Sequence, residues 1–457
     1  YGDHRDLHLS IRRQRQMCIR DSLNSASNFN IANTFMTPDV IAREALLILE
    51  NNIVSPQVMS TSAVGDFTGA KVGDTIRVRR PAFFGVDEFG RTSSSQSTTI
   101  KIQDAVENSV NLQIEKHFDV SFEVSSKELT LAVDDFNERL LKPAMSALAQ
   151  KIDEYALSKI ADLGGLQGPS TTYAAPATLP EVAAIVEKMN NQMIPMENRK
   201  LLVSPSMQSA LYAIDAFVRA DIRGGAFTSP VQEASLGRFM GLDTMMTQML
   251  PKHSAMGSAA STGSTDAVYA TSAAATEGAT SININAGPAG TLTLKKGDTL
   301  SIDYADGVTR DHVVTNTSIA FGSNAITGVG IFPAAYGIGG VAAVAGGVPE
   351  VIASGAVVKN TTTTLNAAGT TTASSPVTSY TMGAAFHPSA FQMVFAPQAN
   401  PMGPGTSSAT VNYNGMSLRV LQTYDHQFKR DLISVDCLVG AAVVDGRLGV
   451  RIPSVNG

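Results

Sequence analysis

Residues 72–162 constrain the fold most, because their apolar pattern changes along the chain from a period of two to a period of three or four. In the first part, apolar and polar residues alternate, which places the apolar side chains on one face of a strand. We therefore expect β-strands that are packed on one side only. The alternating runs are residues 75–79, 100–102, 110–114 and 118–124.

The connection between these strands, residues 81–99, is rich in Gly, Ser, Thr and charged residues. A connection of about twenty residues is long for a hairpin inside a compact domain. We expect the tip of this arm to project from the body and to find its contacts elsewhere.

From Asp134 to Ile160 the apolar residues recur every three or four positions, which predicts one apolar stripe along a helix. Such a helix would be roughly 40 Å long. Pro143 removes one backbone hydrogen bond, so it predicts either a bend or the first turn of a new helix. Gly164 and Gly165 predict the helix end. A projecting arm fixed to a stiff helix favours assembly between copies over catalysis.

A chain of 457 residues can hold two or three cores. Charged residues make up 16%, Trp is absent and Gly is plentiful, which favours strands and loops. The sequence has no uninterrupted apolar run of about 18 residues, so we expect no membrane span. We also expect no signal peptide. Two cysteines, Cys18 and Cys437, exclude a disulfide framework and fit a reducing cytoplasm.

The net charge is −6, so the composition does not predict the basic face that nucleic-acid-binding proteins usually carry. Residues 1–22 are Arg-rich and show neither helical nor strand periodicity. They resemble translated sequencing-adapter sequence, and we exclude them from the fold prediction as a probable non-native artefact. The alternative interpretation is a basic arm that binds DNA or a scaffold.

Two segments predict α/β structure before residue 252. Thr37, Pro38 and Asp39 are typical of a helix start, and the helix is expected to end at Asn51–Asn52. After a linker at residues 164–177, a helix begins with capping-box residues, a buried strand follows, and Ser206 is expected to start another helix. The capping-box residues are Thr178 and Glu181, and the strand is residues 200–204.

The composition shifts near His253, and Ser, Ala, Gly and Thr dominate residues 254–290. Short β-like segments continue to Tyr380, which predicts an inserted all-β domain, either a barrel or a sandwich. Residues 432–441 are almost continuously apolar, as expected of a central strand. We therefore expect residues 201–251 and 383–453 to form one domain that the insert divides.

No pattern predicts catalysis, and we expect no cofactor and no metal site. Two of the seven His residues lie in residues 1–22, and the other five show neither zinc-ligand spacing nor a His-Glu-x-x-His motif. His387 precedes a proline, and a capping or packing role is preferred over that of a base. Asp134 and Asp135 complement a helix dipole, and Cys437 is expected to be a buried, inert thiol. Turns explain the glycines of residues 337–342 better than a nucleotide site does.

In their order along the chain, several segments resemble tailed-bacteriophage major capsid (coat) proteins of the Hong Kong 97-type fold. The similarity is to the podovirus-coat-like subgroup, which carries an inserted β domain. It rests on residues 73–81, 120–129, 135–153, 294–298, 384–387, 419–421 and the last apolar strand. Some relatives form Lys–Asn cross-links, but the sequence does not pair a Lys with an Asn here.

The resemblance implies an α+β fold with an extended β arm (the E-loop), a long spine helix, peripheral and axial domains, and an inserted all-β domain. The expected boundaries are 23–71 for the N-terminal arm and helix, 72–124 for the extended arm, 125–200 for the spine helix and peripheral domain, 201–252 with 381–457 for the axial domain, and 253–380 for the insert.

The implied function is structural: pentamers and hexamers of this chain would build an icosahedral shell. The shell would enclose double-stranded DNA without sequence-specific binding, and it would assemble in the host bacterial cytoplasm. A scaffolding protein and a portal are the implied partners, with no membrane and no enzymatic reaction. The expected contacts between subunits are Arg79, Arg80, Phe83, Phe84, Glu88 and Phe89.

Three alternatives stay open. Arg79 and Arg80 have two equally good interpretations. They could contact acidic residues of a neighbouring subunit, or they could lie on a solvated strand edge whose charge prevents aggregation. The whole chain could form an encapsulin-like nanocompartment shell around an enzyme. A β-rich adhesin or glycan-binding module on residues 254–380 is a third possibility, against which the missing secretion signal argues.

Overall fold

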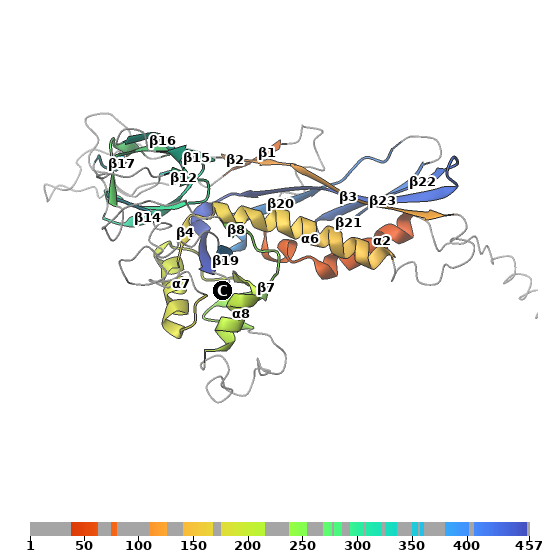
Figure 1. The fold of residues 1–457 in the computed structure, drawn as a ribbon, viewed down its shortest axis with the longest axis horizontal. Coiled ribbons are helices and arrows are strands. Elements are labelled where there is room, and N and C mark those ends of the chain that lie inside the picture. The colour runs from red at the N-terminus through yellow and green to blue at the C-terminus, as the bar shows by residue number, and fades with distance from the viewer. Residues whose placement is uncertain are drawn as a thin grey trace, which may run out of the picture.

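The computed structural model combines helices and strands in an α+β arrangement of two large sheets and one barrel (Figure 1). It describes residues 38–62, 75–79, 109–125, 140–167, 175–214, 237–253, 268–276, 278–285, 293–305, 307–320, 325–335, 350–354, 357–360, 380–401 and 406–454. Asp134, Asp135 and the glycines of residues 337–342 lie outside these ranges.

The first sheet, called here the long sheet, is built around β23 (Arg430–Val443). One edge of β23 pairs with β3 (Lys116–Ser125), and the other edge pairs first with β22 (Met416–Asp425) and then with β20 (Phe391–Ala396). Strand β21 (Thr406–Tyr413) completes the sheet beside β22. The prediction that residues 432–441 form a central strand is confirmed.

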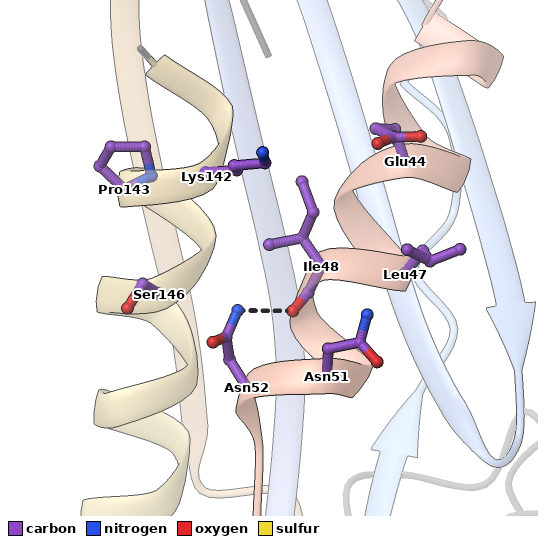
Figure 2. A pocket seen from close by; sticks show the side chains of 8 residues that line it. All are labelled: Glu44, Leu47, Ile48, Asn51, Asn52, Lys142, Pro143 and Ser146. Carbon is purple, nitrogen blue, oxygen red and sulfur yellow. Dashed lines mark hydrogen bonds between the residues drawn. The ribbon is translucent and has the colours of Figure 1, made fainter. Parts of the chain in front are cut away.

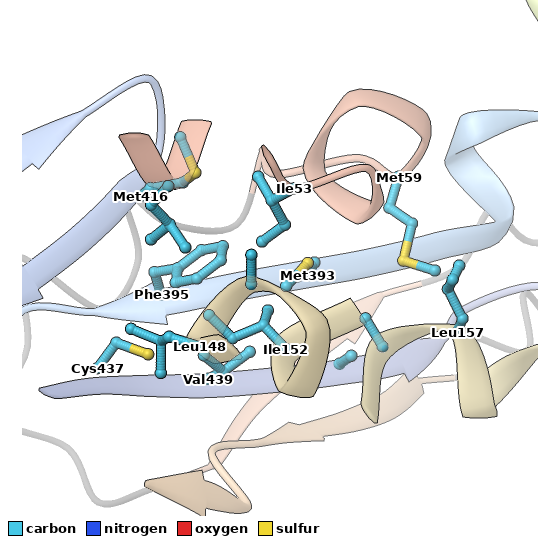
Figure 3. Packing of buried hydrophobic residues seen from close by; sticks show 14 of the residues in the cluster. Ile53, Met59, Leu148, Ile152, Leu157, Met393, Phe395, Met416, Cys437 and Val439 are labelled. Carbon is cyan, nitrogen blue, oxygen red and sulfur yellow. The ribbon is translucent and has the colours of Figure 1, made fainter. Parts of the chain in front are cut away.

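Helices α2 (Pro38–Asn52) and α6 (Lys142–Ser158) pack with the long sheet into one hydrophobic core. Figure 3 shows α6 residues Leu148 and Ile152 close to Phe395 and Val439 of the sheet. Complete burial of each such side chain contributes about 1.5–3 kcal/mol. The 17 residues of α6 span about 25 Å. Pro143 lies in the first turn of α6, so of the two predicted outcomes the structure shows a helix start.

A buried carboxylate connects α6 to the short helix α3 (Ser55–Val58). The backbone N–H groups of Val54 and Ser55 donate to Asp153, at 3.1 Å to Oδ2 and 2.9 Å to Oδ1 respectively. Both amides belong to the first turn, where helical N–H groups have no partner within the helix. Burial raises the pKa of Asp153, while the hydrogen bonds from Ser55 and Val54 lower it by less.

The second sheet is called here the short-strand sheet, and its strands run in the order β4, β24, β19, β5, β7, β6. Helices α7 (Leu179–Asn191) and α8 (Pro205–Tyr212) share a hydrophobic core with it. The strand bounds are Gly165–Leu166 for β4, Gly449–Ser454 for β24, Tyr380–Phe386 for β19, Arg199–Val203 for β5, Leu242–Met246 for β7, Arg238–Phe239 for β6, and Lys252–His253 for β8, which pairs with the start of β19.

The local signals that start these helices act as predicted, with one shift. The N–H of Thr178 donates to Glu181 Oε2 at 3.1 Å, so the predicted capping box is confirmed. Helix α8 begins at Pro205 instead of Ser206, because the Ser204 hydroxyl accepts the Met207 N–H at 3.2 Å and caps the helix.

Between β8 and β19, six strands close into a barrel in the order β11, β16, β14, β13, β18, β9. The prediction left a barrel and a sandwich open, and the strand pairing forms the barrel, which leaves no sheet edge unpaired within it. The bounds are Ser281–Asn285 for β11, Ala325–Phe332 for β16, Thr309–Val314 for β14, Thr299–Asp303 for β13, Val357–Asn360 for β18 and Val268–Thr271 for β9.

Two short strand pairs accompany the barrel, and the described residues outside it include short 3-10 turns. The pairs are β12 (Thr293–Lys295) with β15 (Ser318–Ala320), and β10 (Ala275–Thr276) with β17 (Glu350–Ile352). The 3-10 turns are η3 (Lys159–Asp162), η4 (Pro388–Ala390) and η5 (Gly446–Leu448).

The pairing of the predicted arm differs from expectation in its second half. Strand β1 (Thr75–Arg79) pairs with β2 (Ser109–Gln113), but β3 leaves the arm and pairs with β23 over ten residues. Residues 381–457 also divide between the two large sheets, because β19 and β24 join the short-strand sheet while β20 to β23 form the long sheet. Alternation predicts a half-buried strand, but it does not specify the strand's neighbour.

The glycines after α6 have a different role from the predicted helix cap. Gly165 begins β4, and neither Gly164 nor Gly165 adopts a positive φ. A Cβ on Gly164 would lie 3.1 Å from the Asp311 carbonyl oxygen, and one on Gly165 would lie 3.0 Å from that of Gly449. These glycines therefore allow close packing of the backbone where the chain leaves α6.

Candidate interaction surfaces

The base of the arm is a two-stranded sheet, β1 with β2, that lies outside both large sheets (Figure 1). Its apolar face is small: Leu112 is buried with Val394 of β20, and Val78 packs against this pair. A Cβ on Gly440 of β23 would lie 2.5 Å from the Gln113 carbonyl oxygen. Glycine at position 440 therefore lets the end of β2 lie directly on the long sheet.

The opposite face of this hairpin is polar and exposed. Arg77 and Arg79 alternate with the apolar residues of β1, and Asn111 and Ser109 stand opposite them on β2. Arg79 is thus the one predicted contact residue that the described ranges include, and it is exposed. Outside those ranges lie Arg80, Phe83, Phe84, Glu88 and Phe89.

A polar cluster joins the root of the arm to α6. The Tyr155 hydroxyl donates to Glu115 Oε2 at 2.9 Å, and Lys159 Nζ donates to the same oxygen at 3.2 Å. Burial, followed by the bond to Glu115, raises the pKa of Tyr155. Burial alone would raise the pKa of Glu115, but the bonds from Tyr155 and Lys159 lower it overall. The carboxylate therefore stays charged and holds the turn between β2 and β3 on the helix.

An open groove of about 510 Å³ lies between α2 and α6 (Figure 2). Glu44 and Lys142 face it from the two helices, and the Asn52 side chain donates to the Ile48 carbonyl oxygen at 2.8 Å on its floor. Leu47, which lines the groove, is 56% exposed, and Val40 of the same helix is also exposed. The lining residues are Glu44, Leu47, Ile48, Asn51, Asn52, Lys142, Pro143 and Ser146.

Other exposed apolar side chains lie at several places on the molecule. Tyr413 stands at the β21–β22 turn, whereas Tyr424 and Phe428 stand at the opposite end of β22. Met193 and Met196 are exposed after α7. Single exposed apolar residues are ordinary, but their grouping at several ends of the molecule offers contact points in more than one direction.

The polar face of the long sheet carries paired charges. Asp436 is buried and accepts from Arg419 Nε at 3.1 Å, and His117 Nε2 lies 3.1 Å from its other oxygen. Arg430 pairs with Glu123 across the β23–β3 ladder. Because positive and negative groups alternate here, this face does not present the basic patch that would hold a polyanion.

The predicted non-catalytic roles of His387 and Cys437 agree with their surroundings. His387 Nδ1 accepts from Ser389, from Oγ at 2.6 Å and from the backbone N–H at 3.3 Å, so the imidazole caps η4. Cys437 is buried in β23, and burial, followed by Asp436, raises the pKa of its thiol to about 12. Within the described ranges, no three His, Cys, Asp or Glu side chains are grouped as metal ligands would be.

Sequence reasoning missed the buried polar contacts between the barrel and the short-strand sheet, where Arg451 of β24 is completely buried. One signal was available. Arg451 stands in the run Gly449-Val450-Arg451-Ile452-Pro453, whose other members are apolar or Gly, and a cation inside such a strand requires a partner.

None of the helices in the described ranges has the length and apolar character needed to cross a membrane. No protein-family model matches the sequence, and no curated protein matches it.

Similar solved structures include structures from phages and a virus-like particle. A structure from Mycobacterium phage Che8 is 11% identical, with a TM-score of 0.45, and the match covers 87% of this chain and 90% of that chain. The mature capsid of bacteriophage PhiM1 is 10% identical, with a TM-score of 0.41 and coverage of 85% and 84%. The virus-like particle from Pyrococcus furiosus is 7% identical, with a TM-score of 0.35 and coverage of 90% and 97%.

Proposed function

We propose that this chain is the shell-forming subunit of a tailed phage, a major capsid protein of which many copies enclose double-stranded DNA. The observation that carries the proposal is the β1–β2 hairpin. It belongs to neither large sheet, and a few apolar side chains hold it on the body. Isolated two-stranded hairpins are marginally stable in water, so this arm needs further contacts. Neighbouring copies would supply them.

Two further features support the proposal. A shell subunit contacts neighbours on several sides, and the exposed apolar residues stand at separate ends of the molecule. Each stable interface would bury more than about 1,000 Å². The paired charges on the long sheet suit a wall that encloses DNA without sequence-specific binding. Pentamers and hexamers of this chain, a scaffolding protein and a portal are the proposed partners, in virions assembled in the host cytoplasm.

The predicted domain boundaries stay in the proposal with two changes that follow from the strand pairing. Strand β3 moves from the arm to the domain of the spine helix α6, and strands β20 to β23 move to that domain from the axial domain. The axial domain then keeps α8, β5, β7, β19 and β24.

Expression of residues 23–457 tests the proposal by electron microscopy and by the content of the particles. We expect this chain to form closed shells, either alone or with the scaffolding protein of the source genome. After phage infection, the shells should protect double-stranded DNA. A protein cargo in place of DNA would favour the nanocompartment alternative. A subunit that stays monomeric beside its own scaffolding protein would refute shell formation.

A further inference from the structure

A buried polar joint connects the barrel to the short-strand sheet. Its barrel side is the turn between β12 and β13, residues 296–298, and its body side is β24, β8 and the end of η3. Strands β8 and β19, through which the chain enters and leaves the barrel region, pair side by side with Tyr380 opposite His253. We call this strand pair the neck. Two paired strands alone would let the barrel rotate about the neck.

Arg451 is the centre of the joint. Its side chain is completely buried in β24. Nη1 donates to the Gly297 carbonyl oxygen at 2.6 Å and to that of Ala161, in η3, at 3.2 Å. Nη2 donates to the Thr299 hydroxyl. One guanidinium therefore holds the body helix end and the barrel turn together, and its planar fork fixes their relative orientation.

The turn is shaped to receive these contacts. Asp298 is completely buried, and it accepts the Lys295 N–H at 2.8 Å through Oδ2 while His253 Nε2 lies 3.2 Å from Oδ1. Gly297 has a φ of +93°, and a Cβ there would lie 2.8 Å from Cε1 of His253. A glycine is thus required by the backbone conformation and by the imidazole that packs on it.

A second contact between the barrel and the body, at a distance from the neck, is an ion pair. Asp311 of β14 is buried, and Lys188 Nζ of α7 lies 2.6 Å from its Oδ2. Ser301 Oγ donates to Asp311 Oδ1 at 2.6 Å, within the barrel. Two contacts at different points prevent rotation about either one.

We propose that Arg451 is a clamp that fixes the barrel in one orientation on the body, with Lys188 and Asp311 as its second point of attachment. The barrel is then a rigid part of the subunit, and its outer surface faces one direction. Without the turn, the Arg451 guanidinium would lose Gly297 and Thr299 as acceptors and would keep the Ala161 carbonyl oxygen, so the body favours the docked barrel over an undocked one. The inference concerns the single subunit and does not depend on shell formation.

Double electron–electron resonance tests the clamp on the full chain. Spin labels at Val308→Cys in the barrel and Ala183→Cys in α7, with Cys18→Ser, would report the distance between barrel and body; positions 308 and 183 are exposed. The parent should give one narrow distance peak. Arg451→Met should broaden or divide it, and amide exchange at residues 297–299 should increase.

Arg199→Met is the matched control, because Arg199 is also buried in the same sheet but donates to Ile194 and Pro195, within the body. It should keep the narrow peak. Should Arg451→Met fail to fold, Gly297→Ala decides, and it should broaden the peak by displacing the turn from His253. A narrow peak in every variant that folds would overturn the proposal, as would equal broadening in Arg199→Met.

Discussion

At the scale of single residues, buried ionisable groups give the clearest predictions of how the stability of the protein depends on pH. His312 of β14 is completely buried in the barrel, where Tyr304 OH lies 2.7 Å from Nε2 and the Pro333 carbonyl oxygen lies 2.8 Å from Nδ1. Burial lowers the pKa of His312 to about 4. The neutral imidazole that this favours donates from Nδ1 and accepts at Nε2.

We predict that acid destabilises the barrel through His312. In the unfolded chain its pKa is about 6.5, so the unfolded state binds the proton first as pH falls. The stability that neutral His312 provides is present above pH 6.5 and is lost progressively down to about pH 4, by up to about 3 kcal/mol. Denaturant unfolding between these pH values should show this slope, and His312→Gln should lack it. Equal slopes would contradict the assignment.

A second prediction at this scale concerns Asp153, which accepts from the first amides of α3. Asp153→Ala should lower the free energy of unfolding by about 1–3 kcal/mol, because two buried N–H groups lose their acceptor. Glu154→Ala, at the exposed neighbouring position, is the control and should change it by less than about 0.5 kcal/mol. Chemical denaturation measures both, and an equal loss in the two variants would rule out the capping role.

At the scale of elements, the spacing of apolar residues predicted well which segments are helices and which are strands. It predicted poorly which strands pair with each other. Helices α2 and α7 and strands β1, β2 and β5 lie where the pattern placed them. Helix α6 lies within the predicted range of residues 134–160, of which residues 134–139 are outside the described ranges. Strand β3 has the same alternation as β1, yet its partner β23 begins about three hundred residues later, at Arg430. A half-buried strand needs a neighbour, but its own sequence does not identify one.

The candidate site shows the same limit. The roles of His387 and Cys437 follow from adjacent residues and from an apolar run, and both were predictable. Arg451 contacts Gly297, which is 154 positions earlier in the chain, so no local pattern encodes the contact. The sequence shows only that a cation stands in an apolar strand.

Gly440 gives a prediction for an element, the β1–β2 hairpin. Gly440→Ala should push the end of β2 away from the long sheet, because its Cβ would lie 2.5 Å from the Gln113 carbonyl oxygen and 3.2 Å from the Ile114 Cα. Amide hydrogen exchange at residues 109–113 should then become faster, while residues 199–203 of β5 should exchange as in the parent. Unchanged protection of β2 would show that the hairpin does not depend on this approach.

At the scale of the whole molecule, the three main parts of the chain are self-contained, whereas the β1–β2 hairpin is not. The long sheet with α2 and α6, the short-strand sheet with α7 and α8, and the barrel each have a core of their own. In the described part of the arm, β1 and β2 share only the small cluster around Leu112 and Val394. Loss of the arm should therefore affect association far more than folding.

Replacement of residues 82–98 by a short Gly-Ser linker tests this claim most directly, with sedimentation and negative-stain microscopy as the measurements. We predict a folded, soluble subunit that has the parent's unfolding midpoint but forms no closed shells under conditions in which the parent does. Normal shells from the shortened chain would contradict it.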